Sequence, residues 1–155
     1  MQNYQTNRGN PSRPSAGQTQ QSALPMDERQ ILQAVFTADP NGEKLVTYAE
    51  RVGKRLVDEK LTRSQIRNIF SESRKIQTSW DAQNPKLSLR RLILLKPKLA
   101  YQAAKENKPV LVYFRSVLSK AIDQVNKSAD QTKSFEIFMQ LFEAILAYHR
   151  SYGGN

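Results

Sequence analysis

Residues 84–101 read NPKLSLRRLILLKPKLAY, and this stretch decides the fold. Asn84 is a suitable N-cap, and Pro85 takes the first helical position, where no backbone N–H donor is needed. Apolar residues cover most of the circumference of the predicted helix, which is typical of a helix at the centre of a bundle. Pro97 cannot donate to the residue four positions back, so we expect a kink or short break around Leu95 and Lys96.

Three helices are predicted before this stretch. Residues 27–36 form a short leading helix, and residues 43–60 carry an apolar stripe at three-and-four spacing. Thr62 and Gln65 form a capping box that opens the next helix, which we expect to run to about Trp80. Each of these segments has helical rather than strand periodicity, so the N-terminal half contributes no sheet.

Two further helices are predicted after it. Residues 110–125 begin with a strand-like composition but continue with helical period. Ser128 and Gln131 suggest a second capping box before the last helix, and the connections between all the helices are only a few residues long. The predicted fold class is therefore all-α, a compact antiparallel bundle of about five helices plus a short leading helix.

The first 25 residues differ from the rest. They are rich in Gln, Asn, Ser, Thr, Pro and Gly, and Leu24 is the only large aliphatic residue among them. Such a composition buries too little apolar surface to offset the entropy of ordering. We expect residues 1–25 to be a disordered polar arm and residues 26–155 to be a single helical bundle domain.

Positive charge is concentrated in one third of the chain. The formal net charge is +10, and residues 60–105 supply +9 of it, from eleven basic and two acidic side chains. Residues 26–59 carry a net −2. A charge imbalance of this size predicts a polyanionic partner for the segment 60–105.

Catalysis and redox chemistry find little support in the sequence. The chain has no cysteine, its single histidine, His149, fits a core-edge or surface position, and no Gly-rich phosphate loop or metal-ligand spacing occurs. We expect no enzymatic activity, no cofactor and no metal. No apolar run approaches the roughly 20 residues that span a bilayer, so we expect a soluble cytoplasmic protein.

The basic residues follow helical spacing. Arg63, Arg67 and Arg74 fall within roughly 40° of one another around their helix, and a row of three on the Pro97 helix does the same. If the two helices pack as antiparallel neighbours, these rows line a groove suited to phosphates. The predicted RNA-binding residues are Arg63, Arg67, Arg74, Lys75, Arg90, Arg91, Lys98, Lys105 and, as a weaker candidate, Lys54.

Three motifs carry a family resemblance. The runs LTRSQIRNIF at 61–70, LKPKLAY at 95–101 and FEIFMQLFEAILAYH at 135–149 occur in this order. Together they resemble the small helical subunit of the type III-A CRISPR effector (Csm) complex, and the resemblance extends from about Gly42 to Tyr148.

The resemblance implies a function as well as a fold. It implies a non-catalytic subunit of an antiviral ribonucleoprotein that stacks in several copies along the guide RNA. Its partners would be single-stranded target RNA, guide RNA, other subunits and further copies of itself. Arg63 and Arg67 fall in the Gln-Ile-Arg motif and Lys98 in the Pro-x-Leu-Ala-Tyr motif, where we expect Tyr101 to be a packing residue.

Two other interpretations remain open from the residues alone. A helix-turn-helix protein could place Gln65, Arg67 and Asn68 in the major groove of DNA. A helical adaptor could use apolar stripes to bridge proteins, with the charge serving solubility.

Overall fold

The computed structural model describes residues 24–155, and its helices confirm the all-α prediction, with no strand in this range. The predicted elements all occur, and the central stretch is divided in two. The helices are α1 Met26–Thr37, α2 Glu43–Asp58, α3 Arg63–Thr78, α4 Pro85–Ile93, α5 Leu95–Glu106, α6 Pro109–Lys127 and α7 Gln131–Ser151.

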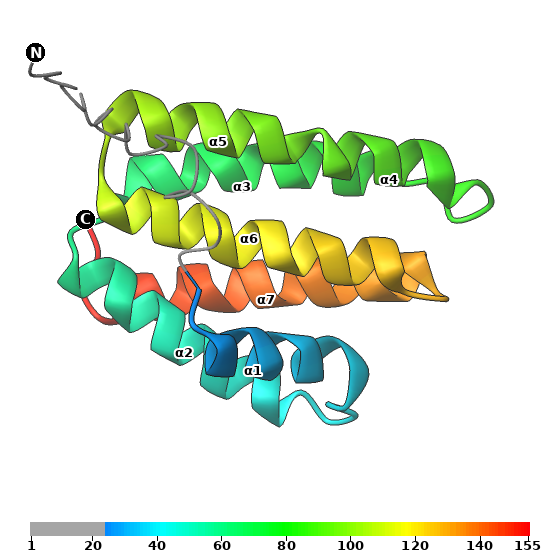
Figure 1. The fold of residues 1–155 in the computed structure, drawn as a ribbon, viewed down its shortest axis with the longest axis horizontal. Coiled ribbons are helices and arrows are strands. Elements are labelled where there is room, and N and C mark those ends of the chain that lie inside the picture. Colours follow the sequence, from blue (N-terminus) through cyan, green and yellow to red (C-terminus); the bar gives the residue numbers. More distant parts are fainter. Residues whose placement is uncertain (1–23) are drawn as a thin grey trace, which may run out of the picture.

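The helices form two layers of roughly parallel and antiparallel rods (Figure 1). One layer holds α1, α6 and the consecutive pair α4–α5, and the other holds α2, α7 and α3. Helices α6 and α7 occupy the middle of their layers and pack on each other, so they form the centre of the bundle. No helix within residues 24–155 is long and apolar enough to cross a membrane.

Aromatic side chains fill the centre. Phe114 of α6 and Phe138 and Phe142 of α7 are buried, and their rings stack with centroids 5.6 Å and 6.3 Å apart. Each buried aromatic removes a large apolar area from water, so this cluster is a major source of stability. The strand-like residues 110–114 lie in the first turns of α6 because their apolar side chains pack at helical spacing against α5 and α7.

The expectation that residues 84–101 are central to the bundle is wrong. Leu89, Leu92, Leu95 and Leu99 point into the core, but other apolar residues of α4, of α5 and of the junction between them face outward. The pair lies at the edge of the bundle in Figure 1, so only one face is covered by other helices. The exposed residues are Leu87, Leu94 and Tyr101, at 56%, 53% and 68% exposure.

The predicted break near Pro97 is confirmed, one residue earlier than expected. Helix α4 ends at Ile93, and α5 begins at Leu95 after the single residue Leu94. This division places Pro97 in the first turn of α5, where a missing N–H leaves no intrahelical bond unmade.

One predicted capping box is confirmed and the other is wrong. At α3, Thr62 accepts a bond from the backbone N of Gln65, and the Gln65 side chain accepts one from the backbone N of Thr62. At α7, Asp130 is the cap, and it accepts a bond from the backbone N of Lys133 at 3.0 Å. Ser128 instead accepts a bond from the backbone N of Asp130, closing the turn before the helix.

The predicted disordered arm falls on residues 1–25, of which 1–23 lie outside the described residues. Leu24 is 2% exposed and belongs to the hydrophobic core, and Pro25 precedes the first turn of α1. The ordered packing therefore includes Leu24, whose isobutyl group is removed from water.

Candidate nucleic-acid interface

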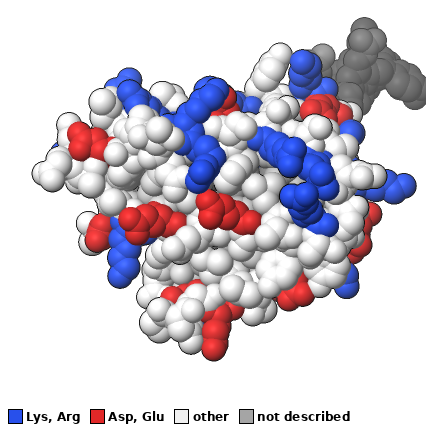
Figure 2. All heavy atoms as spheres, turned by 180° about the vertical axis from the view of Figure 1, so that it is seen from behind, with Lys and Arg blue, Asp and Glu red and all other residues white. Residues whose placement is uncertain are grey.

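Basic side chains gather on the side of the molecule that α3, α4 and α5 form. We call these helices, with their connections over residues 60–105, the basic side. Seen from behind in Figure 2, most of the blue side chains lie in separate groups over the upper half of the molecule, where α3 lies, among uncharged and a few red ones, and a broken row of red side chains lies beneath them. Folding thus keeps the charge of a continuous segment together rather than spreading it over the surface.

Arg67 is the member of the α3 row whose side chain has no partner among the described residues. It is exposed, and its guanidinium makes no hydrogen bond or ion pair with any residue in the part of the chain that the structure describes. An exposed guanidinium without a carboxylate partner is available for a bidentate contact with phosphate.

Arg63 is bonded to the C-terminal residues of the chain. It is half-buried at the start of α3, its backbone N donates to the carbonyl O of Asn155 at 2.5 Å, and its Nη2 lies 3.5 Å from the carbonyl O of Gly154. Its buried Nε has no partner among the described residues. Arg63 therefore anchors the C-terminal residues, and His149, which is 1% exposed and lies 2.8 Å from the carbonyl O of Leu61, holds the same region.

Arg74 points toward α7. Its guanidinium lies 3.4 Å from a Glu143 carboxylate oxygen, 2.8 Å from the Gln77 amide oxygen and 5.9 Å from the centre of the Phe70 ring. The α3 row therefore faces the α7 side of the helix rather than α5.

The row on α4 and α5 faces a groove between these helices and α3. A hollow of about 720 Å³ is lined by Lys98 and Lys105, and an adjoining one of about 330 Å³ is lined by Lys75, Arg91 and Lys98. Arg91 also donates to the Ser79 hydroxyl at 3.0 Å. The prediction that both basic rows line one groove is wrong: a groove lies between these helices and α3, but Arg63, Arg67 and Arg74 do not line it, because they lie on another face of α3.

Glu72 sits between the two hollows and partly neutralises them. Its carboxylate oxygens lie 3.0 Å from Nζ of Lys75 and 3.3 Å from Nζ of Lys98. Hydrogen bonds from Lys75 and Lys98 lower the pKa of the Glu72 carboxyl, so it is ionised at neutral pH. Exposed ion pairs of this kind are weak, so a phosphate can compete for both lysines.

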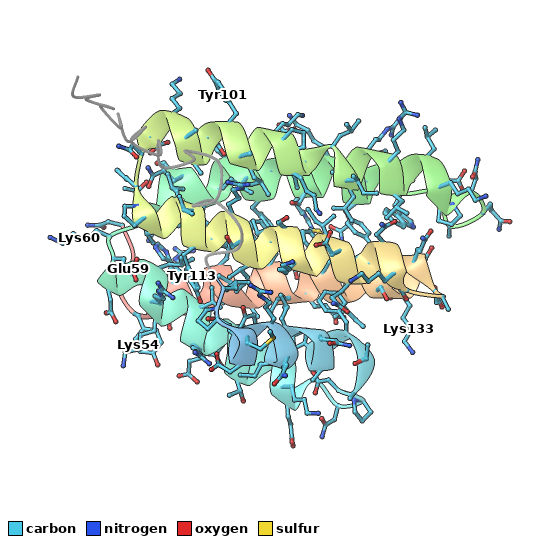
Figure 3. All side chains as sticks on the ribbon, in the orientation of Figure 1. Lys54, Glu59, Lys60, Tyr101, Tyr113 and Lys133 are labelled. Atoms are coloured by element: carbon cyan, nitrogen blue, oxygen red, sulfur yellow. The ribbon has the colours of Figure 1, made fainter. Side chains whose placement is uncertain are left out.

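Of the remaining candidate RNA-binding residues, Arg90 and Lys105 lie on the basic side, and Lys54 does not. Arg90 on α4 and Lys105 on α5 are exposed and make no ion pair within residues 24–155. Lys54 is also exposed, but it projects from α2 at the opposite edge of the molecule from Tyr101 (Figure 3). The structure brings the other candidates onto the basic side and leaves Lys54 apart from them.

Tyr101 does not match its expected packing role. Its side chain is 68% exposed and points away from the bundle in Figure 3. The signal was present in the sequence, because Leu87, Leu94 and Tyr101 recur every seven residues and share a face that Leu92 and Leu99 do not. This spacing was difficult to recognise because apolar residues occur on most sides of the predicted helix.

Comparison with known proteins identifies the family. A search of curated proteins found no match, and a search of solved structures found none either. A family model described as Csm2 Type III-A matches residues 39–155, which is most of the chain and includes all three motifs of the resemblance. The chain therefore belongs to the Csm2 family, which consists of structural subunits of the multi-subunit type III-A CRISPR (Csm) complex and is not known as catalytic.

Proposed function

We propose that this chain is a non-catalytic RNA-binding subunit that stacks in several copies along the guide RNA of a type III-A CRISPR ribonucleoprotein. It contacts the backbone of single-stranded target RNA through its basic side and serves antiviral defence in the cytoplasm. One observation carries the proposal: the +9 segment 60–105 folds into adjacent helices on one side of the bundle. Family membership supports the assembly with other Csm subunits.

The basic residues contribute unequally to this function. Arg67, Arg90 and Lys105 are exposed and unpaired within the described range, so they contact phosphates directly. Arg74, Arg91, Lys75 and Lys98 exchange weak surface contacts for phosphate. Arg63 acts by holding the start of α3, and Lys54, on the opposite edge, adds only long-range attraction.

Contacts of this kind do not read sequence. Arginine and lysine bind phosphate oxygens that every nucleotide carries, and base-edge hydrogen bonds are what distinguish sequences. Affinity should therefore be nearly equal for different unstructured RNAs and should fall as salt rises.

The helix-turn-helix alternative is less well supported by the arrangement of α2 and α3. These helices pack on opposite sides of α7 rather than on each other. In a helix-turn-helix protein the two helices meet at the turn, and the second enters the major groove. The adaptor alternative gains support from the exposed apolar residues of α4 and α5, which a protein partner could cover.

The test is binding of labelled, unstructured single-stranded RNA to the full chain over a range of salt concentrations. The variant Arg67→Glu should lower affinity by about tenfold or more and reduce the salt slope by about one. Lys133→Glu is the matched control, since it makes the same change in net charge at an exposed position of α7, away from the basic side.

Equal losses in the two variants would show that only net charge matters, and the proposed interface would be wrong. Duplex DNA of the same length serves as competitor. A preference for a particular duplex sequence would restore the helix-turn-helix interpretation, and no binding to either nucleic acid would favour the adaptor.

A further inference from the structure

Tyr101 is an exposed aromatic residue that the fold does not use. Its ring is 68% exposed, and its hydroxyl makes no hydrogen bond to any residue from 24 to 155. By contrast, Tyr48 and Tyr113 are buried and bonded to Glu28, and Tyr152 donates to Glu50 at 2.6 Å. Exposure of so much aromatic surface is unfavourable for the isolated protein unless a ligand covers it.

Two lysines flank Tyr101 on the same helix. Lys98 and Lys105 lie three residues before and four residues after it, so all three side chains emerge from one face of α5. Both lysines are exposed. Seven residues of helix rise about 10.5 Å along the axis, so the two lysines emerge on either side of Tyr101 along α5.

The groove beside α5 adds polar groups. Tyr101, Lys98 and Lys105 line the hollow of about 720 Å³, and Asn68 of α3 and Gln102 of α5 line it with them. Their side-chain amides can both donate and accept hydrogen bonds. Such groups suit the edge of a base, whose donors and acceptors are mixed, while the lysines suit phosphates.

We propose that Tyr101 stacks on an unpaired base of single-stranded RNA while Lys98 and Lys105 hold the phosphates on either side. This inference rests on the proposed RNA-binding function and names its ligand more closely: single-stranded rather than duplex nucleic acid, held by base stacking as well as by charge. Stacking tolerates any sequence because every base has a π-face. The base contact therefore adds affinity without adding sequence specificity.

Charge favours RNA over an apolar protein partner at this position. Leu87 and Leu94 continue the exposed face toward the start of α4, and Arg91 and Lys98 lie four residues beyond them. Cations that border an aromatic ring match alternating bases and phosphates in a single strand. A protein partner would need carboxylates in the same places, and it is the competing outcome of the test.

The experiment compares Tyr101→Ala with Tyr101→Phe in the full chain. Affinities are measured for an unstructured RNA and for an oligonucleotide of the same length with abasic positions. Tyr101→Ala should weaken binding of the intact RNA about tenfold, while Tyr101→Phe should keep wild-type affinity. On the abasic oligonucleotide the wild type and Tyr101→Ala should bind equally. Val46→Ala, at an exposed apolar position of α2 outside the basic side, is the control and should retain affinity.

Crosslinking gives an independent readout. RNA that carries 5-iodouridine should crosslink to Tyr101 on irradiation, and mass spectrometry locates the modified residue. Crosslinks confined to other aromatic residues, or an equal loss on intact and abasic oligonucleotides, would overturn the inference.

The outcomes separate this inference from the proposed function. If the wild type binds RNA and Arg67→Glu weakens it but Tyr101→Ala does not, base stacking is wrong and RNA binding stands. If the wild type binds no RNA, both are wrong, and the exposed face of α4 and α5 is a protein-docking surface.

Discussion

The two edges of the bundle use charge in opposite ways. At the edge formed by α1 and α2, which we call the acidic side, Glu28 is 1% exposed and accepts hydrogen bonds from the hydroxyls of Tyr48 at 3.1 Å and Tyr113 at 2.5 Å. Arg51 lies 3.8 Å from the same carboxylate. On the basic side, by contrast, the charged groups lie at the surface, and several have no partner within the described chain.

The difference separates charge that holds the fold together from charge available to a ligand. A buried carboxylate must be hydrogen-bonded, because loss of its water is otherwise too unfavourable. An exposed cation needs no partner, and its interactions remain exchangeable. Changes on the acidic side should therefore alter stability, and changes on the basic side should alter binding.

The largest effect is expected at Glu28. Glu28→Ala leaves two buried tyrosine hydroxyls without their acceptor and should lower the free energy of unfolding by about 3 kcal/mol. Chemical denaturation measures it, and Glu28→Gln, which keeps an acceptor oxygen, should cost less. Glu136→Ala, at an exposed position of α7, is the control. A loss as small as that of the control would contradict the distinction between the two sides.

The next effect is expected where α2 crosses α7. A Cβ at Gly53 would lie 2.8 Å from Cβ of Tyr148 and 3.0 Å from the backbone N of His149. Gly53→Ala should therefore destabilise the protein by about 2 kcal/mol, although alanine is the better helix former. Thermal unfolding checks this, and a rise in Tm would show that the two helices separate easily.

High pH should also weaken the acidic side. Burial, with the Glu28 carboxylate, raises the pKa of Tyr48 and of Tyr113 well above the ordinary tyrosine value. The folded chain keeps these protons while the unfolded chain loses them near pH 10, so stability is full below about pH 10 and falls above it. Denaturant midpoints across that range measure the decline, which should flatten in Tyr48→Phe. An unchanged slope in that variant would count against the buried network.

The smallest effect is expected at Glu72, a surface carboxylate on the basic side. Glu72→Gln removes a surface charge that pairs with Lys75 and Lys98. Stability should change by less than about 0.5 kcal/mol, but RNA affinity should rise about threefold because both lysines become free for phosphate. Parallel denaturation and RNA titration test the two halves of the prediction. Lower affinity would mean that Glu72 itself contacts the RNA.

Local signals gave the predictable parts of the fold. Three features depend only on residues close together in the chain and are therefore predictable from the sequence. They are the capping box of Thr62 and Gln65, the break before Pro97 and the helical spacing of each segment. The second capping box was predicted wrongly because Ser128 and Asp130 are both suitable N-cap residues and lie two positions apart. In the structure Ser128 closes the turn, and Asp130 caps the helix.

The site was less predictable than the fold. Sequence placed the basic residues on one segment, but it could not tell which face of α3 packs against α7. That packing turned Arg74 toward Glu143 and left the groove to Lys75, Lys98 and Lys105. The pairing of Glu72 with Lys98 joins residues 26 positions apart and has no signal in local spacing.

The sequence by itself determined the helices, the concentration of charge in residues 60–105 and the motifs shared with the Csm2 family, because these depend on residue type and short-range spacing. Only the tertiary structure decided that α6 and α7 form the centre and that α4 and α5 lie at the edge. Burial is a property of contacts between distant segments, and these contacts placed Leu99 in the core and left Tyr101 at the surface.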